Sequence, residues 1–292
     1  MRHAALPALL IAGIALGGCN EGVLDPKGPI AVAERLILLN STGIMLAIVI
    51  PTMLGTLGIA YWFRASNQRA RYMPEFDYSG RLELLIWSIP IMTVLLVGGV
   101  TWIGSYDLDP RKPIPSTASP IRVQVVSLDW KWLFIYPDQG IAAVNALIVP
   151  VRTPISFELT SSGVMNSLFV PQLGGQIYTM AGMVTRLHLQ ADQSGTYRGM
   201  SANYSGAGFS DMYFKVDAVS TERFAQWVAA TRTTGPVLDA QTYADLAKPS
   251  QAVTSFSYRT VAPDLFKGIV SSLSTLEHAS RFVSPSSQRA EK

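Results

Sequence analysis

Two long stretches without a charged residue dominate the first third of the chain. They cover residues 36–63 and 84–106, and charged residues bound each of them on both sides. At about 1.5 Å per residue, a helix over either stretch is long enough to cross a hydrocarbon core of about 30 Å. Pro51 and Pro90 lie inside the stretches, which membrane helices tolerate when neighbouring groups satisfy the freed carbonyls. The pattern predicts a hairpin of two transmembrane helices over residues 36–106.

The segment between the two predicted helices is rich in arginine. It covers about residues 64–81 and contains Arg64, Arg69, Arg71 and Arg81. Lys and Arg set the orientation of a membrane hairpin, whereas Asp and Glu contribute little. We therefore predict that this loop is cytoplasmic, and that the N-terminus and everything after residue 106 lie on the outer face.

From residue 120 onward, apolar and polar positions alternate over short stretches. Segments such as "RVQVVSL", "SFELT" and "TRLHLQ" have the period of two that is typical of half-buried strands. Roughly seven to nine such strands in about 100 residues predict a small Greek-key β-sandwich over residues 120–220. From residue 221 to 292, "ERFAQWVAATR" and "DAQTYADLAK" predict two surface helices before a polar tail. The fold class is thus membrane α+β: a helix hairpin, a sandwich and a short helical extension.

The first residues have the pattern of a signal peptide. "MRHAALPALLIAGIALGGC" begins with Arg2, continues with an apolar run and ends with small residues before Cys19. "LGGC" resembles the lipobox of bacterial lipoproteins, which predicts removal of residues 1–18, a lipid anchor on Cys19 and a periplasmic segment over residues 19–35. The alternative is an ordinary signal peptide with a coincidental cysteine. Because Cys19 is the only cysteine, the chain forms no internal disulfide.

Composition supports a membrane protein and argues against nucleic acid as a partner. Hydrophobic residues make up 49% of the chain and charged residues only 15%, which is unusual for a soluble domain. The formal net charge is +3. Because the charge is small and forms no basic stripe, binding to nucleic acid is not expected.

Several ordered segments resemble subunit II of the haem-copper terminal oxidases. They are the aromatic "DWKWLFIY", the segment "MNSLFVPQLGGQIYTMAGM" and the later "MSANYSGAGFSDMYFKV". The resemblance covers nearly the whole mature chain and implies a cupredoxin-like domain after the helix hairpin. In the cytochrome c oxidase branch, that domain binds a binuclear copper centre through two Cys, two His, a Met and a Glu backbone carbonyl.

The copper ligands of that branch are almost all replaced here. The family's ligand loop has the spacing C-x-E-x-C-x-x-x-H-x-x-M, and the matching positions are Ser201, Asn203, Ser205, Phe209 and Met212. The remaining family histidine corresponds to Asn166. Soft copper sites need thiolate and imidazole donors, and His188 and His278 lie outside both segments. We expect no metal and no cofactor in this chain, with Met212 as a core residue.

This replacement resembles the quinol oxidase branch, specifically the cytochrome bo-type ubiquinol oxidases. "GPIA" before the first span, "FIYPDQGIAAVN" and "VAPDLFKGIV" add to the resemblance. It implies a non-catalytic subunit of a proton-translocating complex in the bacterial inner membrane that oxidises ubiquinol and reduces dioxygen to water. The implied partners are the catalytic subunit I, with its haems and a single copper, and the smaller subunits III and IV. Membrane lipids surround the hairpin.

The resemblance also implies roles for individual residues. Glu83 corresponds to a glutamate at the mouth of a proton channel, although a carboxylate in a first helical turn is also favoured by the helix dipole alone. Trp130 and Trp132 are two apart, so on one strand they share a face, and we expect them to pack against the catalytic subunit. Two alternatives stay open: a cytochrome c oxidase subunit with copper, and a lipid-anchored binding or sensing module without a respiratory role.

Overall fold

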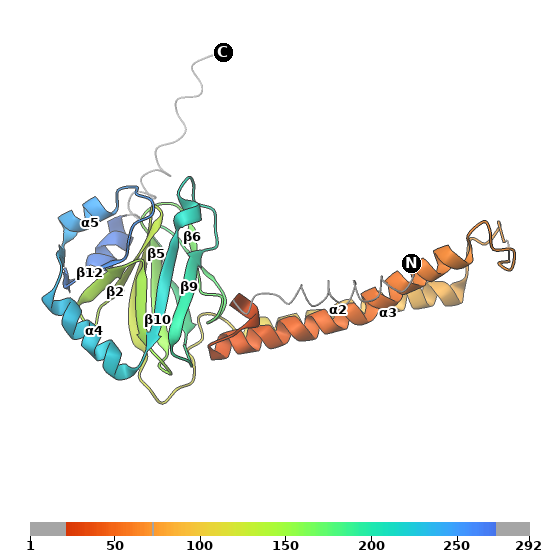
Figure 1. Cartoon of the computed structure of the whole chain (residues 1–292), viewed down its shortest axis with the longest axis horizontal. Helices are drawn as coiled ribbons and strands as arrows, with labels where there is room; N and C mark the ends of the chain where they lie inside the picture. Colours follow the sequence, from red (N-terminus) through yellow and green to blue (C-terminus); the bar gives the residue numbers. More distant parts are fainter. Residues whose placement is uncertain (1–21, 72, 273–292) are drawn as a thin grey trace, which may run out of the picture. The chain divides into compact units, whose positions relative to one another are not determined.

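The computed structural model describes residues 22–71 and 73–272. The predicted signal peptide, Cys19 and His278 lie outside the described residues. The described chain forms two compact units, one of residues 33–109 and one that combines residues 22–32 with residues 110–272 (Figure 1). The first unit contains the apolar helices and the second contains the β-structure.

The hairpin consists of two long helices, α2 (Pro29–Trp62) and α3 (Gly80–Asp107). Both are long and apolar enough to cross a membrane, as the charge-free stretches predict. α2 begins earlier than the apolar run, because Pro29 occupies the first helical position, where a missing N–H costs nothing. Pro51 and Pro90 lie inside the helices without ending them. After a short 3-10 turn, Gly22–Leu24, the segment before α2 packs on the sandwich: Lys27 N–H donates to the Gln172 carbonyl at 2.7 Å.

The second unit is a sandwich of two sheets. The larger sheet has the order β12-β3-β2-β1-β5-β8 and the smaller one β4-β10-β9-β6-β7. Antiparallel pairs predominate, but β1 pairs with β5, and β4 with β10, in parallel. The strands of the two sheets are β1 (Ile121–Leu128), β2 (Lys131–Tyr136), β3 (Ile141–Val144), β4 (Ala146–Pro150), β5 (Ile155–Ser161), β6 (Asn166–Phe169), β7 (Ile177–Thr179), β8 (Thr185–Leu189), β9 (Gly195–Ser201), β10 (Tyr213–Val219) and β12 (Phe256–Tyr258).

The main core lies between the two sheets and is rich in aromatic side chains. Phe214 of β10 packs against Trp132 and Phe134 of β2, with ring centroids 5.6 and 5.0 Å apart. All three side chains are buried, as are Val125 and Phe157 from the neighbouring strands. The period-two segments therefore form the predicted half-buried strands, with their apolar faces turned inward.

The C-terminal extension contains the two predicted helices, α4 (Thr221–Thr233) and α5 (Ala240–Leu246). It also contains features that the pattern did not predict. β12 adds an edge strand to the larger sheet by pairing with β3, β11 (Val237–Leu238) pairs with β13 (Thr260–Val261), and residues 265–272 are helical. A second apolar cluster, which includes Leu133, Leu238 and Phe266, joins the extension to the outer face of that sheet. Figure 1 shows α4, α5 and β12 on the same side of the sandwich.

Candidate functional site

The candidate site is the segment of residues 201–212, which we call the remnant loop, together with Asn166. Ser201 ends β9, Met212 directly precedes β10, and Asn166 begins β6. β9 lies between β10 and β6 in the smaller sheet, so the topology brings the three positions to one end of that sheet. The backbone joins the loop ends directly, because Ser201 N–H donates to the Met212 carbonyl at 3.2 Å.

Ser201 is the centre of a small hydrogen-bond network. Its hydroxyl lies 3.1 Å from Asn166 Oδ1 and 3.2 Å from the Asn203 carbonyl oxygen. Asn203 in turn donates through Nδ2 to the Met165 carbonyl at 3.0 Å. Both Ser201 and Asn166 are buried, where an unsatisfied polar group is costly. The residues at the lost ligand positions thus satisfy one another's hydrogen-bonding groups.

The other loop positions are held by packing. The Ser205 hydroxyl lies 3.9 Å from Met212 Sδ, and Met212 is buried within the main core cluster. The Phe209 ring packs on Tyr204 with centroids 5.6 Å apart and an interplanar angle of 63°. The sequence-predicted positions other than Phe209 are therefore linked by side-chain contacts, and Phe209 joins the loop through an aromatic pair.

The donor atoms of the remnant loop do not fit a binuclear copper centre. They comprise hydroxyls, amides, the Asp211 carboxylate, one thioether and backbone carbonyls, whereas such a centre needs thiolate and imidazole ligands. Within residues 22–71 and 73–272, no group of three or more His, Cys, Asp and Glu side chains is placed to hold a metal ion. The loop keeps the spacing of the family's ligand loop without its ligand chemistry.

Trp130 and Trp132 do not share a face, so that prediction is wrong. A turn separates β1 from β2, and Trp130 sits in it with a φ of 63°, whereas Trp132 lies on β2 and is fully buried. The positive φ turns Trp130 towards the remnant loop, where its indole N–H donates to the Ser205 carbonyl at 3.1 Å. A Cβ at Gly208 would lie 2.5 Å from this ring. Trp132 therefore packs within its own chain.

Lys131, which lies between these tryptophans, is a structural residue that the sequence analysis missed. It is 1% exposed, and its Nζ donates to the Lys248 carbonyl at 2.8 Å, to Ser250 Oγ at 2.7 Å and to the Asp129 carbonyl at 3.3 Å. Burial lowers the pKa of Lys131, and the charge of Asp129 opposes this shift. A lysine inside an apolar strand was the only sequence signal. Lys131 ties the C-terminal extension to the turn that carries Trp130.

Lys131→Met is expected to loosen the extension. The substitution leaves the Lys248 carbonyl and the Ser250 hydroxyl without a donor, at a cost of about 1–3 kcal/mol. Hydrogen exchange should therefore become faster over residues 248–253, and the melting temperature should fall. Lys248→Met is the matched control, because that ammonium is exposed and its ion-pair partner among residues 22–71 and 73–272 is the exposed Asp245, at 2.7 Å. Equal exchange in both variants would contradict the role of Lys131.

Glu83 lies in the first turn of α3 and its side chain is exposed. Its backbone N–H donates to the Ser79 carbonyl at 2.9 Å.

His188 of β8 lies between Ser156 Oγ at 3.3 Å and the Pro110 carbonyl at 3.2 Å. Arg186 lies opposite Glu158 in the same strand pair. These contacts give His188 a structural position outside the remnant loop.

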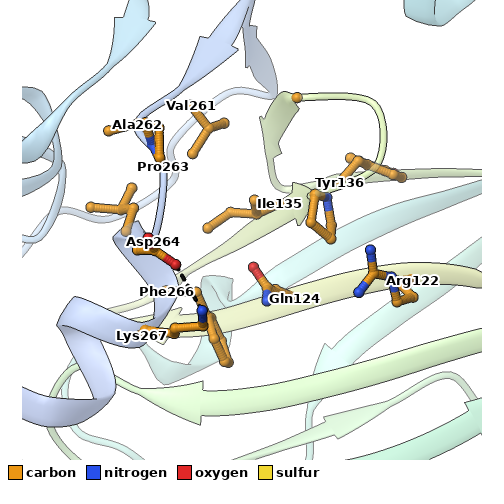
Figure 2. Close-up of a pocket in the computed structure, with 13 residues that line it drawn as sticks. Arg122, Gln124, Ile135, Tyr136, Val261, Ala262, Pro263, Asp264, Phe266 and Lys267 are labelled. Carbon is orange, nitrogen blue, oxygen red and sulfur yellow. Dashed lines mark hydrogen bonds and ion pairs between the residues drawn. The ribbon is translucent and has the colours of Figure 1, made fainter.

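A hollow of about 270 Å³ lies where the extension meets β1 and β2. Its charged side chains are already paired: Figure 2 shows Lys267 bonded to Asp264, at 2.8 Å, and Arg122 pairs with Asp138. The pairing lowers the pKa of Asp138, chiefly through the hydrogen bond from Arg122. We assign this hollow no binding role.

Comparison with known families gives the class of the chain. Residues 138–219 match the family described as cytochrome c oxidase subunit II, periplasmic domain. Residues 232–272 match the COX aromatic rich motif. Two apolar helices followed by a cupredoxin-like sandwich and this extension define subunit II of the haem-copper oxidases.

Individual relatives narrow the class to the quinol branch. Cytochrome bo(3) ubiquinol oxidase subunit 2 of Pseudomonas aeruginosa is 46% identical over 90% of this chain and 78% of its own length. Ubiquinol oxidase subunit 2 of Acetobacter aceti is 48% identical over 89% and 85%. Quinol oxidase subunit 2 of Bacillus subtilis is 40% identical over 83% and 76%. The chain belongs to the family of ubiquinol oxidase subunit 2.

The chain is therefore part of an oxidoreductase complex of the respiratory chain. The comparisons do not favour a stand-alone binding or sensing module, which was the main alternative. They also favour the quinol branch over a copper-carrying cytochrome c oxidase subunit, because the relatives bear quinol oxidase names.

Proposed function

We propose that this chain is the redox-inactive subunit of a proton-translocating ubiquinol oxidase that reduces dioxygen to water. The observation that carries the proposal is the remnant loop, which keeps its internal contacts while Ser, Asn and Phe side chains occupy the positions of the Cys and His ligands. A quinol is dissolved in the bilayer, so it delivers electrons from within the membrane and needs no external copper relay. Haems and a single copper are then carried by subunit I.

The same proposal includes a topology and an anchor. The arginine-rich loop lies in the cytoplasm, the sandwich lies in the periplasm, and Cys19 carries a lipid. Contacts within the second unit support this arrangement. Asp192 N–H donates to the Lys27 carbonyl at 2.8 Å, and Ala31 is fully buried. Because the residues before α2 and those after α3 pack together, both ends of the hairpin emerge on one side of the membrane.

The contribution of the chain is assembly, anchoring and proton uptake. The exposed side chains of the two membrane helices, such as Leu84, Met92 and Trp102, provide surface for the catalytic subunit, subunits III and IV and lipid. The sandwich and its extension add a large periplasmic body to the complex.

The test is to purify the tagged chain in mild detergent and to measure its spectrum and oxygen uptake. We expect haem bands in the reduced-minus-oxidised spectrum and oxygen uptake with ubiquinol. Ascorbate-reduced cytochrome c should not support oxygen uptake. A colourless preparation would contradict the proposal, and activity with cytochrome c would show a copper relay in this chain.

Glu83→Gln is expected to lower the turnover of the assembled oxidase several-fold. The substitution keeps the size and hydrogen-bonding capacity of the side chain but removes its ability to take up a proton. Glu83 is placed for uptake because it is exposed in the first turn of α3. Steady-state oxygen uptake measures the effect, and gel electrophoresis of the purified complex checks assembly. Glu75→Gln, in the neighbouring loop, is the control and should leave turnover unchanged; an equal turnover in both variants would remove the role of Glu83.

A further inference from the structure

The loop between α2 and α3 forms a pocket that the redox function does not use. Its volume is about 740 Å³, and we call it the loop pocket. It lies wholly within the helix-hairpin unit. Its walls include Ile59, Phe63, Arg64, Arg71, Phe76 and Leu82.

The loop pocket combines positive charge with apolar surface. Arg64 and Arg71 line it, and none of its described lining residues is acidic, although Glu75 and Asp77 belong to the same loop. Its apolar walls are open: Ile59 is 63% exposed, Phe63 58% and Phe76 56%. By contrast, another groove along the hairpin, of about 580 Å³, is lined by uncharged residues only. Charge complementarity therefore singles out an anionic, amphiphilic ligand for the loop pocket.

Arg64 is oriented by its neighbours and keeps donors available. Its guanidinium carbon lies 4.1 Å from the centroid of the Tyr61 ring, and its Nε donates to Ser66 Oγ at 3.0 Å. Among the described residues, its terminal nitrogens have no acceptor, and Arg71 has no carboxylate partner. Guanidinium groups bind phosphate through paired hydrogen bonds. The two arginines are therefore suited to a phosphate group.

The position of the pocket matches the boundary between hydrocarbon and headgroups. α2 ends at Trp62 and α3 begins at Gly80, and Tyr61, Trp62 and Phe63 form an exposed aromatic set at this end. Tyr and Trp side chains concentrate at this depth of a membrane. The loop itself is held in shape by Asn67, whose Nδ2 donates to the Trp62 carbonyl at 2.6 Å. A basic pocket in such a place is typical of lipid headgroup recognition.

We propose that the loop pocket binds an anionic phospholipid. The headgroup phosphate bonds to Arg64 and Arg71, and an acyl chain lies along Ile59, Phe63 and Leu82. This inference goes beyond the proposed respiratory function and rests only on its placement of the hairpin in the membrane. It gives the arginine-rich loop a specific ligand in addition to its role in orienting the hairpin.

The test uses the whole oxidase complex in lipid nanodiscs with a photoactivatable phosphatidylglycerol. Peptides covering residues 59–82 should be labelled, and unlabelled phosphatidylglycerol should compete whereas phosphatidylcholine should not. In Arg64→Gln/Arg71→Gln, the apparent dissociation constant at this site should rise about 30-fold, as expected for two cations near a headgroup. The matched control is Arg69→Gln/Arg81→Gln, which removes the same charge from residues outside the pocket and should retain labelling.

Each contrary result overturns the proposal. Equal loss of labelling in both double variants would mean general attraction to the anionic surface. Label elsewhere on the complex and none on residues 59–82 would mean that another subunit covers the pocket. Because labelling of the unsubstituted complex is itself a measurement, the proposal stays testable even where a variant fails to assemble.

Discussion

Replacing Asn166 and Phe209 by His, and Ser201 and Ser205 by Cys, is expected to turn the remnant loop into a copper-binding site. The change supplies two thiolates and two imidazoles at the positions of the family's ligands. The remaining two ligands are already present, because the Asn203 carbonyl is backbone and the Met212 thioether is retained. A chain that has no fitting donor set thereby acquires a complete one.

The geometry supports this expectation. The Ser201 hydroxyl already lies within 3.2 Å of both Asn166 Oδ1 and the Asn203 carbonyl, and the Ser205 hydroxyl lies 3.9 Å from Met212 Sδ. Cys is close to Ser in shape, so two of the four substitutions require little rearrangement. Phe209→His is the most demanding, since it removes the ring that packs on Tyr204.

Elemental analysis of the purified chain and the visible thiolate-to-copper absorbance measure the result. The quadruple variant should retain a pair of copper ions after dialysis. The same variant with Met212→Leu should bind copper more weakly, and the two Cys substitutions without the His substitutions should give no stable centre. A folded quadruple variant with no more copper than the unsubstituted chain would show that only the spacing, and not the ligand geometry, has survived.

The sequence was most informative where a single physical requirement acts along the chain. A membrane span must exclude charge, so the hairpin was visible in residues 36–63 and 84–106. A half-buried strand must alternate, so most strands of the sandwich were visible as well. The spacing from Ser201 to Met212 survives because it is fixed by the β9–β10 connection. The resemblance then located the loop, and the structure shows how its residues satisfy one another.

The features that the sequence could not predict depend on contacts between distant segments. β12 is short, and it becomes a strand only because β3 offers it an edge. Lys131 occupies a strand position where its side chain meets the Lys248 carbonyl and the Ser250 hydroxyl, more than 100 residues later in the chain. Trp130 follows Asp129 into a turn with positive φ, which a two-residue spacing between tryptophans does not reveal. Apart from the lysine within an apolar strand, none of these contacts leaves a local pattern in the sequence.

Gly199→Ala is expected to be the most destabilising single substitution considered for the sandwich. Gly199 lies opposite Phe214 in the β9–β10 pair, and a Cβ at this position would lie 2.1 Å from Phe214 Cζ and 2.2 Å from Cε2. The ring would have to leave its present packing against Trp132 and Phe134. Overpacking typically costs about 1–3 kcal/mol, and displacing a central aromatic ring places this variant at about 3 kcal/mol or above.

Thermal unfolding of the purified chain measures the effect, with an expected fall in melting temperature of roughly 6–12 °C for about 3 kcal/mol. Gly163→Ala is the control, because its Cβ would approach no described atom closer than 3.7 Å.

Adding Phe214→Leu to Gly199→Ala should restore part of the lost stability by removing the clash. A loss of stability that persists unchanged would place its origin elsewhere. Since β9 and β10 also hold Ser201 and Met212 at the two ends of the remnant loop, Gly199→Ala introduced into the quadruple variant should abolish copper binding as well. The stability of the β9–β10 strand pair and the ligand geometry of the remnant loop therefore depend on the same packing. The melting temperature measures the first, and copper binding measures the second.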